Sequence, residues 1–106
     1  MPADDAIKPA VLKALVRDGW TITHDPYRIE VGTDNLYVDV GAERALLGAE
    51  RGVERIAVEV KSFLAPSLLR EFQLALGQFM LYHSAMKRTD PDRKLVMAVS
   101  ETVSPP

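Results

Sequence analysis

Apolar residues recur at helical spacing near the start of the chain, which predicts an amphipathic helix between residues 4 and 20. Asp4 or Asp5 can act as an N-cap, and Gly19 is a stop signal. Because proline is tolerated only in the first turn, we expect the helix to begin within a few residues of Pro9. The stripe expected to face the core consists of Ile7, Val11, Leu12, Leu15 and Val16.

A second, longer helix is expected between residues 66 and 88, where Ser67 is a suitable N-cap. Its apolar residues follow i, i+3 and i+4 spacing, and the sequence TDPD ends it. The stretch KLVMAVS that follows is apolar on both faces, as expected for a central strand in a sheet covered by helices. The apolar stripe of the helix consists of Leu68, Leu69, Phe72, Leu76, Phe79, Tyr82 and Met86.

The β-prone stretches lie between the two helices. WTITHDPYRIEV bends at HDPY, the turn GTDN leads into LYVDVG, and a weaker strand follows in ALLGAE. Gly48 in that strand predicts a bulge or a close backbone approach, and ERGVE is a hairpin turn into RIAVEVK. The predicted order is α-β-β-β-β-α-β, an α/β (α+β) fold with a mixed sheet. A right-handed crossover is expected if the last strand runs parallel to RIAVEV.

Length and composition are those of one soluble domain. The chain has 106 residues, of which 47% are hydrophobic and 26% charged, an ordinary globular balance. It has no cysteine, so disulfides, thiolate nucleophiles and cysteine-bound zinc are excluded. The amino terminus lacks a secretory signal, and no apolar stretch is long enough for a membrane span. We therefore expect a cytoplasmic protein that does not contact a membrane.

The net charge of −2 argues against a protein that binds DNA strongly by itself. A protein that depends on nonspecific phosphate contacts is usually basic. A local basic patch or a basic partner subunit is compatible with this charge, so DNA is expected as a partner that the protein alone binds weakly.

The stretch RIAVEVKSF places two charged residues in a strand that is otherwise built for burial. The side-chain period of a strand is two, so Glu59 and Lys61 project from one face and Ile56, Val58 and Val60 from the other. A charged pair in such a strand needs a partner, a metal ion or a solvent-filled cleft.

Asp39 in LYVDV repeats this design on another strand. If the two strands are neighbours, Asp39 and Glu59 lie side by side, with Lys61 one pleat further on. Two close carboxylates repel each other, and a divalent cation removes this cost. Mg²⁺ prefers oxygen ligands and often uses only one or two carboxylates. We therefore predict a Mg²⁺ or Mn²⁺ site on Asp39, Glu59 and the carbonyl of Val60, with Lys61 beside it to neutralise developing charge.

These residues resemble the Asp…(Asp/Glu)-x-Lys signature of the restriction-endonuclease-like nucleases, the PD-(D/E)xK superfamily. Those proteins carry the signature on adjacent strands behind an amino-terminal helix. Gln78 and Tyr82, which share a helix face, are similar to a Gln-x-x-x-Tyr motif found in some branches. The resemblance implies a restriction-endonuclease-like mixed sheet flanked by helices, with catalytic roles for Asp39, Glu59, Lys61, Gln78 and Tyr82.

Four blocks in order, LVRDGWTITHDP, LYVDVGAE, IAVEVKSF and ALGQF, narrow the resemblance to the XisH family. The similarity runs from about Leu15 to Ser100. The family consists of excision controlling factors associated with the fdxN element of cyanobacteria, so the resemblance implies a role in DNA element excision and a XisI-like partner protein. Family members commonly have a histidine where Lys8 aligns. They also run on past the last strand, so we expect the single domain of residues 1–106 to lack a closing helix and strand.

Three functions are compatible with the sequence. The first is a metal-dependent deoxyribonuclease acting in DNA rearrangement. The second is a catalytically inactive accessory or regulatory subunit that acts through a protein partner, which the acidic charge and small size favour. The third is an α/β domain in which Glu59 and Lys61 form an incidental ion pair. The first requires Asp39 and Glu59 to lie close enough to share an ion, and a homo-oligomer is compatible with all three.

Overall fold

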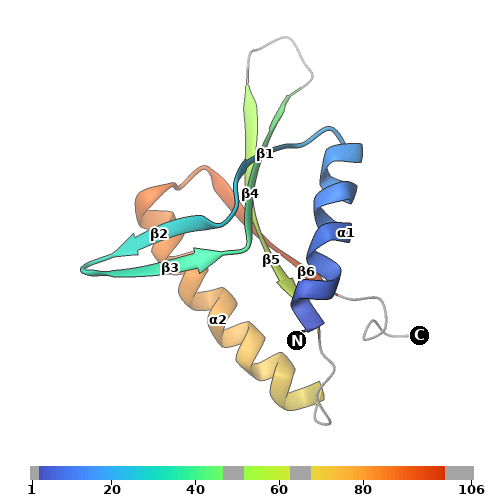
Figure 1. Cartoon of the computed structure of the whole chain (residues 1–106). Coiled ribbons are helices and arrows are strands. Elements are labelled where there is room, and N and C mark those ends of the chain that lie inside the picture. Colours follow the sequence, from blue (N-terminus) through green and yellow to red (C-terminus); the bar gives the residue numbers. More distant parts are fainter. Residues whose placement is uncertain (1–2, 47–51, 63–67, 100–106) are drawn as a thin grey trace.

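The structure, a computed structural model, describes residues 3–46, 52–62 and 68–99. These residues form a mixed α+β fold with two helices and six strands in two sheets. Figure 1 shows α1 on one side of the larger sheet, and α2 with the β2–β3 hairpin on the other. In chain order the elements are α1 (Ala3–Arg17), β1 (Thr21–His24), β2 (Tyr27–Val31), β3 (Asp34–Val38), β4 (Val40–Ala45), β5 (Val53–Lys61), α2 (Leu68–Thr89) and β6 (Arg93–Val99).

The larger sheet has the strand order β1-β4-β5-β6 and is mixed. β4 pairs antiparallel with β1 and β5, whereas β6 runs parallel to β5. The predicted central position of the last strand is wrong, because within the described residues β6 pairs with β5 alone and is an edge. Its two apolar faces pack in the two cores, one under each helix. Leu95 packs in the core under α2, and Ala98 packs in the core under α1.

α1 begins at Ala3, so Pro9 lies in its second turn instead of the predicted first turn. A proline at this place removes one helix hydrogen bond. Packing of the apolar stripe against the sheet offsets that loss, although Val16, which we predicted to belong to the stripe, is exposed. Gly19 follows the helix with a φ of 90°, as expected of a glycine stop. The packed residues of the stripe are Ile7, Val11, Leu12 and Leu15.

The chain changes sheets twice between α1 and β5. After β1 it bends at Asp25–Pro26, where the peptide bond is cis, and β2 pairs with β3 as a separate hairpin. The bend predicted at HDPY is therefore confirmed. The single strand predicted at LYVDVG is wrong, because it is divided at Asp39: β3 belongs to the hairpin and β4 returns to the larger sheet. Five strands precede α2 in the described chain, instead of the predicted four.

β4 occupies Val40–Ala45, so the strand that we predicted at ALLGAE shares only Ala45 with it, and residues 47–50 of that prediction lie outside the described residues. Gly48 and the first two residues of the predicted turn ERGVE lie outside the described residues, and Val53 of that turn already belongs to β5, where it pairs with Ala45 as a hairpin requires. A close backbone approach occurs instead at Gly41. A Cβ atom there would lie 3.0 Å from the Cβ and Nδ1 atoms of His24 and 3.1 Å from the Tyr27 ring.

The two faces of the larger sheet carry separate cores. β5 divides between them as its alternation predicts, because Val58 and its even-numbered neighbours face α1 whereas Ala57 faces α2. Glu59 and Lys61 continue the α2 side. The core under α1 contains Trp20, Val40, Ala42, Ile56, Val58 and Val60. The core under α2 contains Tyr27, Ile29, Val38, Ala57 and Met86.

α2 buries only part of its predicted stripe. Tyr82 and Met86 pack in the core under the helix. Leu69, Phe72 and Leu76, nearer the start of the helix, are exposed. Ser67, the predicted N-cap, lies outside the described residues. Neither described helix has the length and apolar character needed to cross a membrane.

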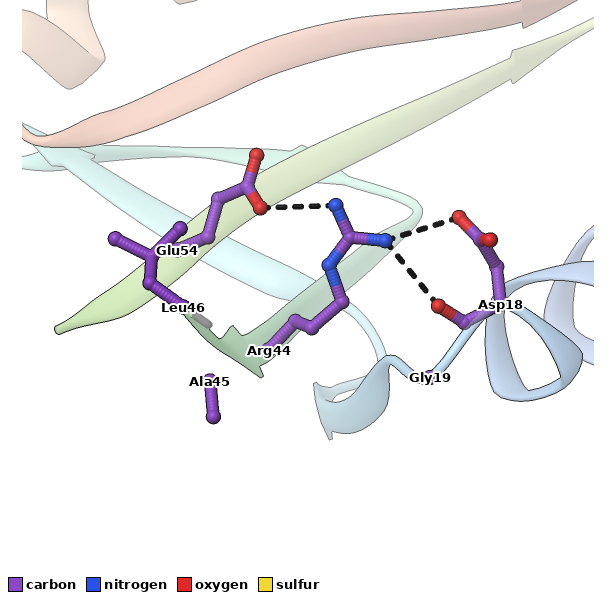
Figure 2. Close-up of a pocket in the computed structure, with 6 residues that line it drawn as sticks. All are labelled: Asp18, Gly19, Arg44, Ala45, Leu46 and Glu54. Atoms are coloured by element: carbon purple, nitrogen blue, oxygen red, sulfur yellow. Dashed lines mark hydrogen bonds and ion pairs between the residues drawn. The ribbon is translucent and has the colours of Figure 1, made fainter. Parts of the chain in front are cut away.

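Arg44 ties the end of α1 to the β4–β5 hairpin. Its guanidinium donates hydrogen bonds to the carbonyl and carboxylate of Asp18 and to the carboxylate of Glu54. It also lies 4.2 Å from the centre of the Trp20 ring. Figure 2 shows Arg44 with Asp18 and Glu54 at a pocket that Gly19, Ala45 and Leu46 also line. Because the Arg44 guanidinium already binds partners within the chain, we interpret its role at this pocket as structural.

Candidate metal centre

Asp39 and Glu59 meet where the hairpin joins the larger sheet. Asp39 immediately precedes β4, whose first residue, Val40, pairs with Val58 of β5. Antiparallel register therefore continues to Asp39 opposite Glu59, which is the neighbour relation predicted from the two strands. The change of sheet after Val38 leaves Asp39 free to turn its side chain toward β5.

Two hydrogen bonds fix this meeting. The backbone N–H of Val60 donates to Asp39 Oδ2 at 2.8 Å, and the backbone N–H of Asp39 donates to Glu59 Oε1 at 3.3 Å. The Asp39 carboxylate therefore accepts a hydrogen bond from the residue after Glu59, and the Glu59 carboxylate accepts one from the backbone of Asp39. Lys61 lies on the same face, with its Nζ atom 3.7 Å from Glu59 Oε2. The structure thus brings together Asp39, Glu59, Lys61 and the backbone of Val60.

The electrostatics of the cluster are unfavourable to two full negative charges. The Glu59 side chain is only 9% exposed. Burial, followed by the adjoining Asp39 carboxyl, raises the pKa of Glu59 to about 7. The Lys61 charge and the Asp39 N–H act in the opposite direction but do not cancel this effect. Glu59 is therefore partly protonated near neutral pH unless another positive charge is present.

The donor set fits a hard divalent cation. Carboxylate and carbonyl oxygens are the ligands that Mg²⁺ prefers, and one or two protein carboxylates are often enough because waters complete the shell. No group of three or more acidic, histidine or cysteine side chains suited to a metal occurs in the described residues. The candidate centre therefore has two carboxylates, those of Asp39 and Glu59. The carbonyl of Val60, the residue after Glu59, is the backbone oxygen predicted as a third ligand.

Gln78 and Tyr82 lie on α2 above the same face of the sheet. Gln78 Nε2 donates to the Tyr82 hydroxyl at 3.0 Å, and Tyr82 also packs against the core that contains Ala57. In the described part of the chain, no hydrogen bond joins either side chain to Asp39, Glu59 or Lys61. The catalytic role of this pair stays a prediction.

Sequence reasoning missed a second charged cluster on the α2 side of the sheet. Arg93 at the start of β6 donates to Asp90 Oδ2 and to the Ile56 carbonyl, both at 2.8 Å, and lies 3.7 Å from a Glu43 oxygen. Its guanidinium is 4.5 Å from the centre of the Tyr27 ring. The available signal was a charged residue entering an apolar strand, the same signal that singled out Glu59.

Comparisons with known proteins agree on one family. A sequence profile of the XisH protein family matches residues 1–105, more of the chain than the four blocks covered. The solved structure of an XisH family protein from Nostoc punctiforme PCC 73102 is 47% identical, with a TM-score of 0.75, over 89% of this chain and 68% of that chain. A fdxN element excision controlling factor protein from Anabaena variabilis is 46% identical, with a TM-score of 0.74, over 90% of this chain and 68% of that one. No curated protein matches the chain.

Proposed function

This chain belongs to the XisH family, and from that premise we propose that it is an excision controlling factor whose Asp39–Glu59 cluster is a nuclease-type metal site acting on DNA. The observation that carries the proposal is the convergence of the Asp39 carboxylate on the nearly buried carboxyl of Glu59, whose pKa is raised to about 7. Such like-charged pairs are costly to fold and are typical of functional sites. The Anabaena variabilis relative is described as an excision controlling factor for a DNA element, which supports DNA as the substrate class.

A restriction-endonuclease-like arrangement would explain why the two carboxylates lie together in this fold. Asp39 and Glu59 stand at neighbouring strands, with α1 behind the sheet. α2 then crosses from β5 to the parallel strand β6. This arrangement is the one that the Asp…Glu-x-Lys signature implies, and we propose it as the architecture of the site.

The roles of the residues follow from their positions. Asp39 and Glu59 would hold Mg²⁺ or Mn²⁺ through carboxylate oxygens, with the carbonyl of Val60 as a third oxygen. A bound ion of this kind supplies Lewis acidity toward a phosphodiester. The Lys61 ammonium, next to Glu59, would orient a water molecule or neutralise negative charge on the phosphate. Gln78 and Tyr82 would be positioning residues that act through α2.

A regulatory role is the second candidate, and two observations favour it. The net charge of −2 is unlike that of an autonomous DNA-binding protein. Exposed apolar side chains on α2, such as Leu69 and Phe72, are typical of a surface that contacts another protein. In this role the protein would act through a XisI-like partner, with the acidic cluster retained but catalytically silent.

Cleavage of DNA in the presence of Mg²⁺ or Mn²⁺ separates the two roles. We would compare linear, supercoiled and branched DNA, using the native chain, Glu59→Gln and Lys61→Ala. A nuclease predicts metal-dependent cleavage that both substitutions reduce by about a hundredfold or more, since each removes a group that acts in the transition state. Glu30→Gln is a matched control, because Glu30 is an exposed carboxylate on the hairpin, paired with Arg28.

Two outcomes would redirect the assignment. Cleavage that survives Glu59→Gln and Lys61→Ala would come from another site or a contaminant. Absence of cleavage by the native chain, together with calorimetric binding of Mg²⁺ that Glu59→Gln abolishes, would assign the cluster a metal-binding role within a regulatory subunit.

A further inference from the structure

Asp39, the residue between the hairpin and the larger sheet, has the same aromatic ring as a neighbour on both of its sides. Val38, immediately before it, pairs with Tyr27 at the base of the hairpin. Gly41, two residues after it, lies so close to Tyr27 that a Cβ atom on Gly41 would be 3.1 Å from the ring. Val38 and Tyr27 are both buried. The position of Asp39 therefore depends on where the Tyr27 ring lies.

Hydrogen bonds connect Tyr27 to β5 through two charged residues, Asp90 and Arg93, which we call the hairpin anchor. The Tyr27 hydroxyl donates to Asp90 Oδ2 at 3.0 Å, in the segment between α2 and β6. Arg93 donates to the same Asp90 oxygen and to the Ile56 carbonyl of β5, both at 2.8 Å. The anchor therefore links the base of the hairpin to a point on β5 that lies three residues before Glu59.

The bond between Tyr27 and Asp90 is insensitive to pH near neutrality. Burial, followed by the hydrogen bond to Asp90, raises the pKa of Tyr27, so its hydroxyl keeps its proton and remains a donor. Burial acts to raise the pKa of Asp90, but hydrogen bonds from Arg93 and Tyr27 lower it, so Asp90 remains a charged acceptor. Donor and acceptor thus stay complementary under the conditions in which the acidic pair would bind a metal ion.

We propose that Tyr27 is a positioning residue for the Asp39–Glu59 pair and acts through the hairpin anchor. β5 carries Glu59, and the hairpin ends next to Asp39. By fixing the hairpin relative to β5, the anchor sets the place from which the Asp39 carboxylate accepts the Val60 N–H at 2.8 Å. Among the described residues Tyr27 forms no hydrogen bond with either carboxylate, so its effect reaches them through the backbone. As an account of a metal site, this inference rests on the proposed function.

NMR spectroscopy of the whole chain without metal tests the inference, because it reports the geometry of the folded state. Tyr27→Phe removes only the hydroxyl and keeps the ring, whose centre is 4.5 Å from the Arg93 guanidinium. The Val60 amide proton should move upfield, since its hydrogen bond to Asp39 lengthens when the hairpin loses its anchor.

Tyr37→Phe is the matched control. It removes the same hydroxyl from the same hairpin, at a tyrosine that is 51% exposed. The Tyr37 hydroxyl forms no hydrogen bond in the described part of the chain, so this variant should leave the Val60 amide proton in place.

A second variant removes the acceptor and changes no ring. Asp90→Ala should move the Val60 amide proton in the same direction as Tyr27→Phe does. If both residues act through one hydrogen bond, the double variant should move it no further than Asp90→Ala alone.

The affinity for Mg²⁺ provides a readout on the site itself. Calorimetry at a temperature where every variant is folded should show a dissociation constant about fivefold higher in Tyr27→Phe, a change of the size expected for one hydrogen bond. Tyr37→Phe should keep the native constant. A loss of folding stability alone would not change the affinity of the folded chain.

The failure of this inference differs from the failure of the proposed function. A Val60 amide proton that stays in place in Tyr27→Phe, or that moves equally in Tyr37→Phe, would overturn the inference, because the anchor would then only stabilise the hairpin. Movement in Tyr27→Phe alone, in a chain that binds no Mg²⁺, would keep Tyr27 as a positioning residue and would refute the metal site.

Discussion

Two charged clusters stand on the same face of the β5–β6 pair, four residues apart along β5, and they are built in opposite ways. At one end, Arg93 is only 3% exposed in its side chain and is surrounded by partners of opposite charge or by a carbonyl. Burial acts to raise the pKa of Asp90, but hydrogen bonds from Arg93 and Tyr27 outweigh it and lower that pKa. This cluster is electrostatically complete.

At the other end, Asp39 and Glu59 carry the same charge, and the pKa of Glu59 moves upward. Lys61 is the only cation within salt-bridge distance of Glu59 among the described residues. The comparison teaches that burial of charge alone does not mark a functional site. The distinguishing feature is whether the charges around the buried group balance, and around Glu59 they do not.

The largest effect on stability is expected from a substitution in the Arg93 cluster, where the charges balance. Arg93→Met should lower the free energy of unfolding by about 3 kcal/mol, because it leaves Asp90 without its ion-pair partner and the Ile56 carbonyl without its donor. Chemical denaturation would measure the change. Arg28→Met is the control, since the exposed pair of Arg28 with Glu30 should contribute less than about 0.5 kcal/mol. Equal losses in the two variants would remove the distinction between the clusters.

A gain of stability is expected from a substitution in the Asp39–Glu59 cluster. Glu59→Gln should raise the free energy of unfolding by about 1–2 kcal/mol at pH 8 with a chelator present, because it removes one of two repelling charges. Asp39 keeps its bond from the Val60 N–H in this variant. A loss of stability at pH 8 would contradict this expectation, because it would show that the native carboxylate of Glu59 makes a net favourable interaction.

The pH dependence of that gain follows from the shifted pKa. Glu59 loses its proton near pH 4.5 in the unfolded chain and near pH 7 in the folded one, so between these values the folded state binds more protons. The contribution of Glu59 to stability therefore falls as the pH rises from about 4.5 to about 7. The advantage of Glu59→Gln should accordingly be small at pH 5 and largest above pH 7, as thermal unfolding at several pH values would show.

The smallest effect is expected from metal binding. Mg²⁺ at ten times its dissociation constant should stabilise the native chain by about 1.4 kcal/mol, following the linkage of binding to folding. Asp39→Asn and Glu59→Gln should lose this response, whereas Arg28→Met should keep it. Thermal unfolding with and without Mg²⁺ at pH 8 measures the difference. A response that is unchanged in Glu59→Gln would place the ion elsewhere on the protein.

The sequence predicted features that depend on local spacing. Period-two alternation placed Glu59 and Lys61 on the face of β5 opposite Val58, and helical spacing located both helices. It did not predict the division at Asp39, because LYVDV reads as one strand and only the competing partners β2 and β5 show that it serves two sheets. The edge position that β6 has among the described strands was missed for a related reason. A strand that is apolar on both faces shows that both faces are covered, but not that both edges are paired.

The candidate centre was found because its residues break the local pattern, whereas its surroundings follow from long-range contacts. The reciprocal bonds between Asp39, Glu59 and the backbone at Val60 depend on the β4–β5 register, which no single segment encodes. Sequence spacing placed Gln78 and Tyr82 on one helix face, and their hydrogen bond agrees with that spacing. The position of α2 above the sheet depends on long-range packing, which the spacing does not encode.

Gly41, two residues after Asp39, allows β4 to pass close to the corner formed by His24 and Tyr27. A Cβ atom at this position would crowd His24 and Tyr27, one on each side of the bend at Asp25–Pro26, and these neighbours would have to give by a few tenths of an ångström. Asp39 immediately precedes β4, so a shift of β4 would also move Asp39. A substitution at position 41 that moves β4 would therefore alter the distance between the two carboxylates while leaving both of them in the sequence.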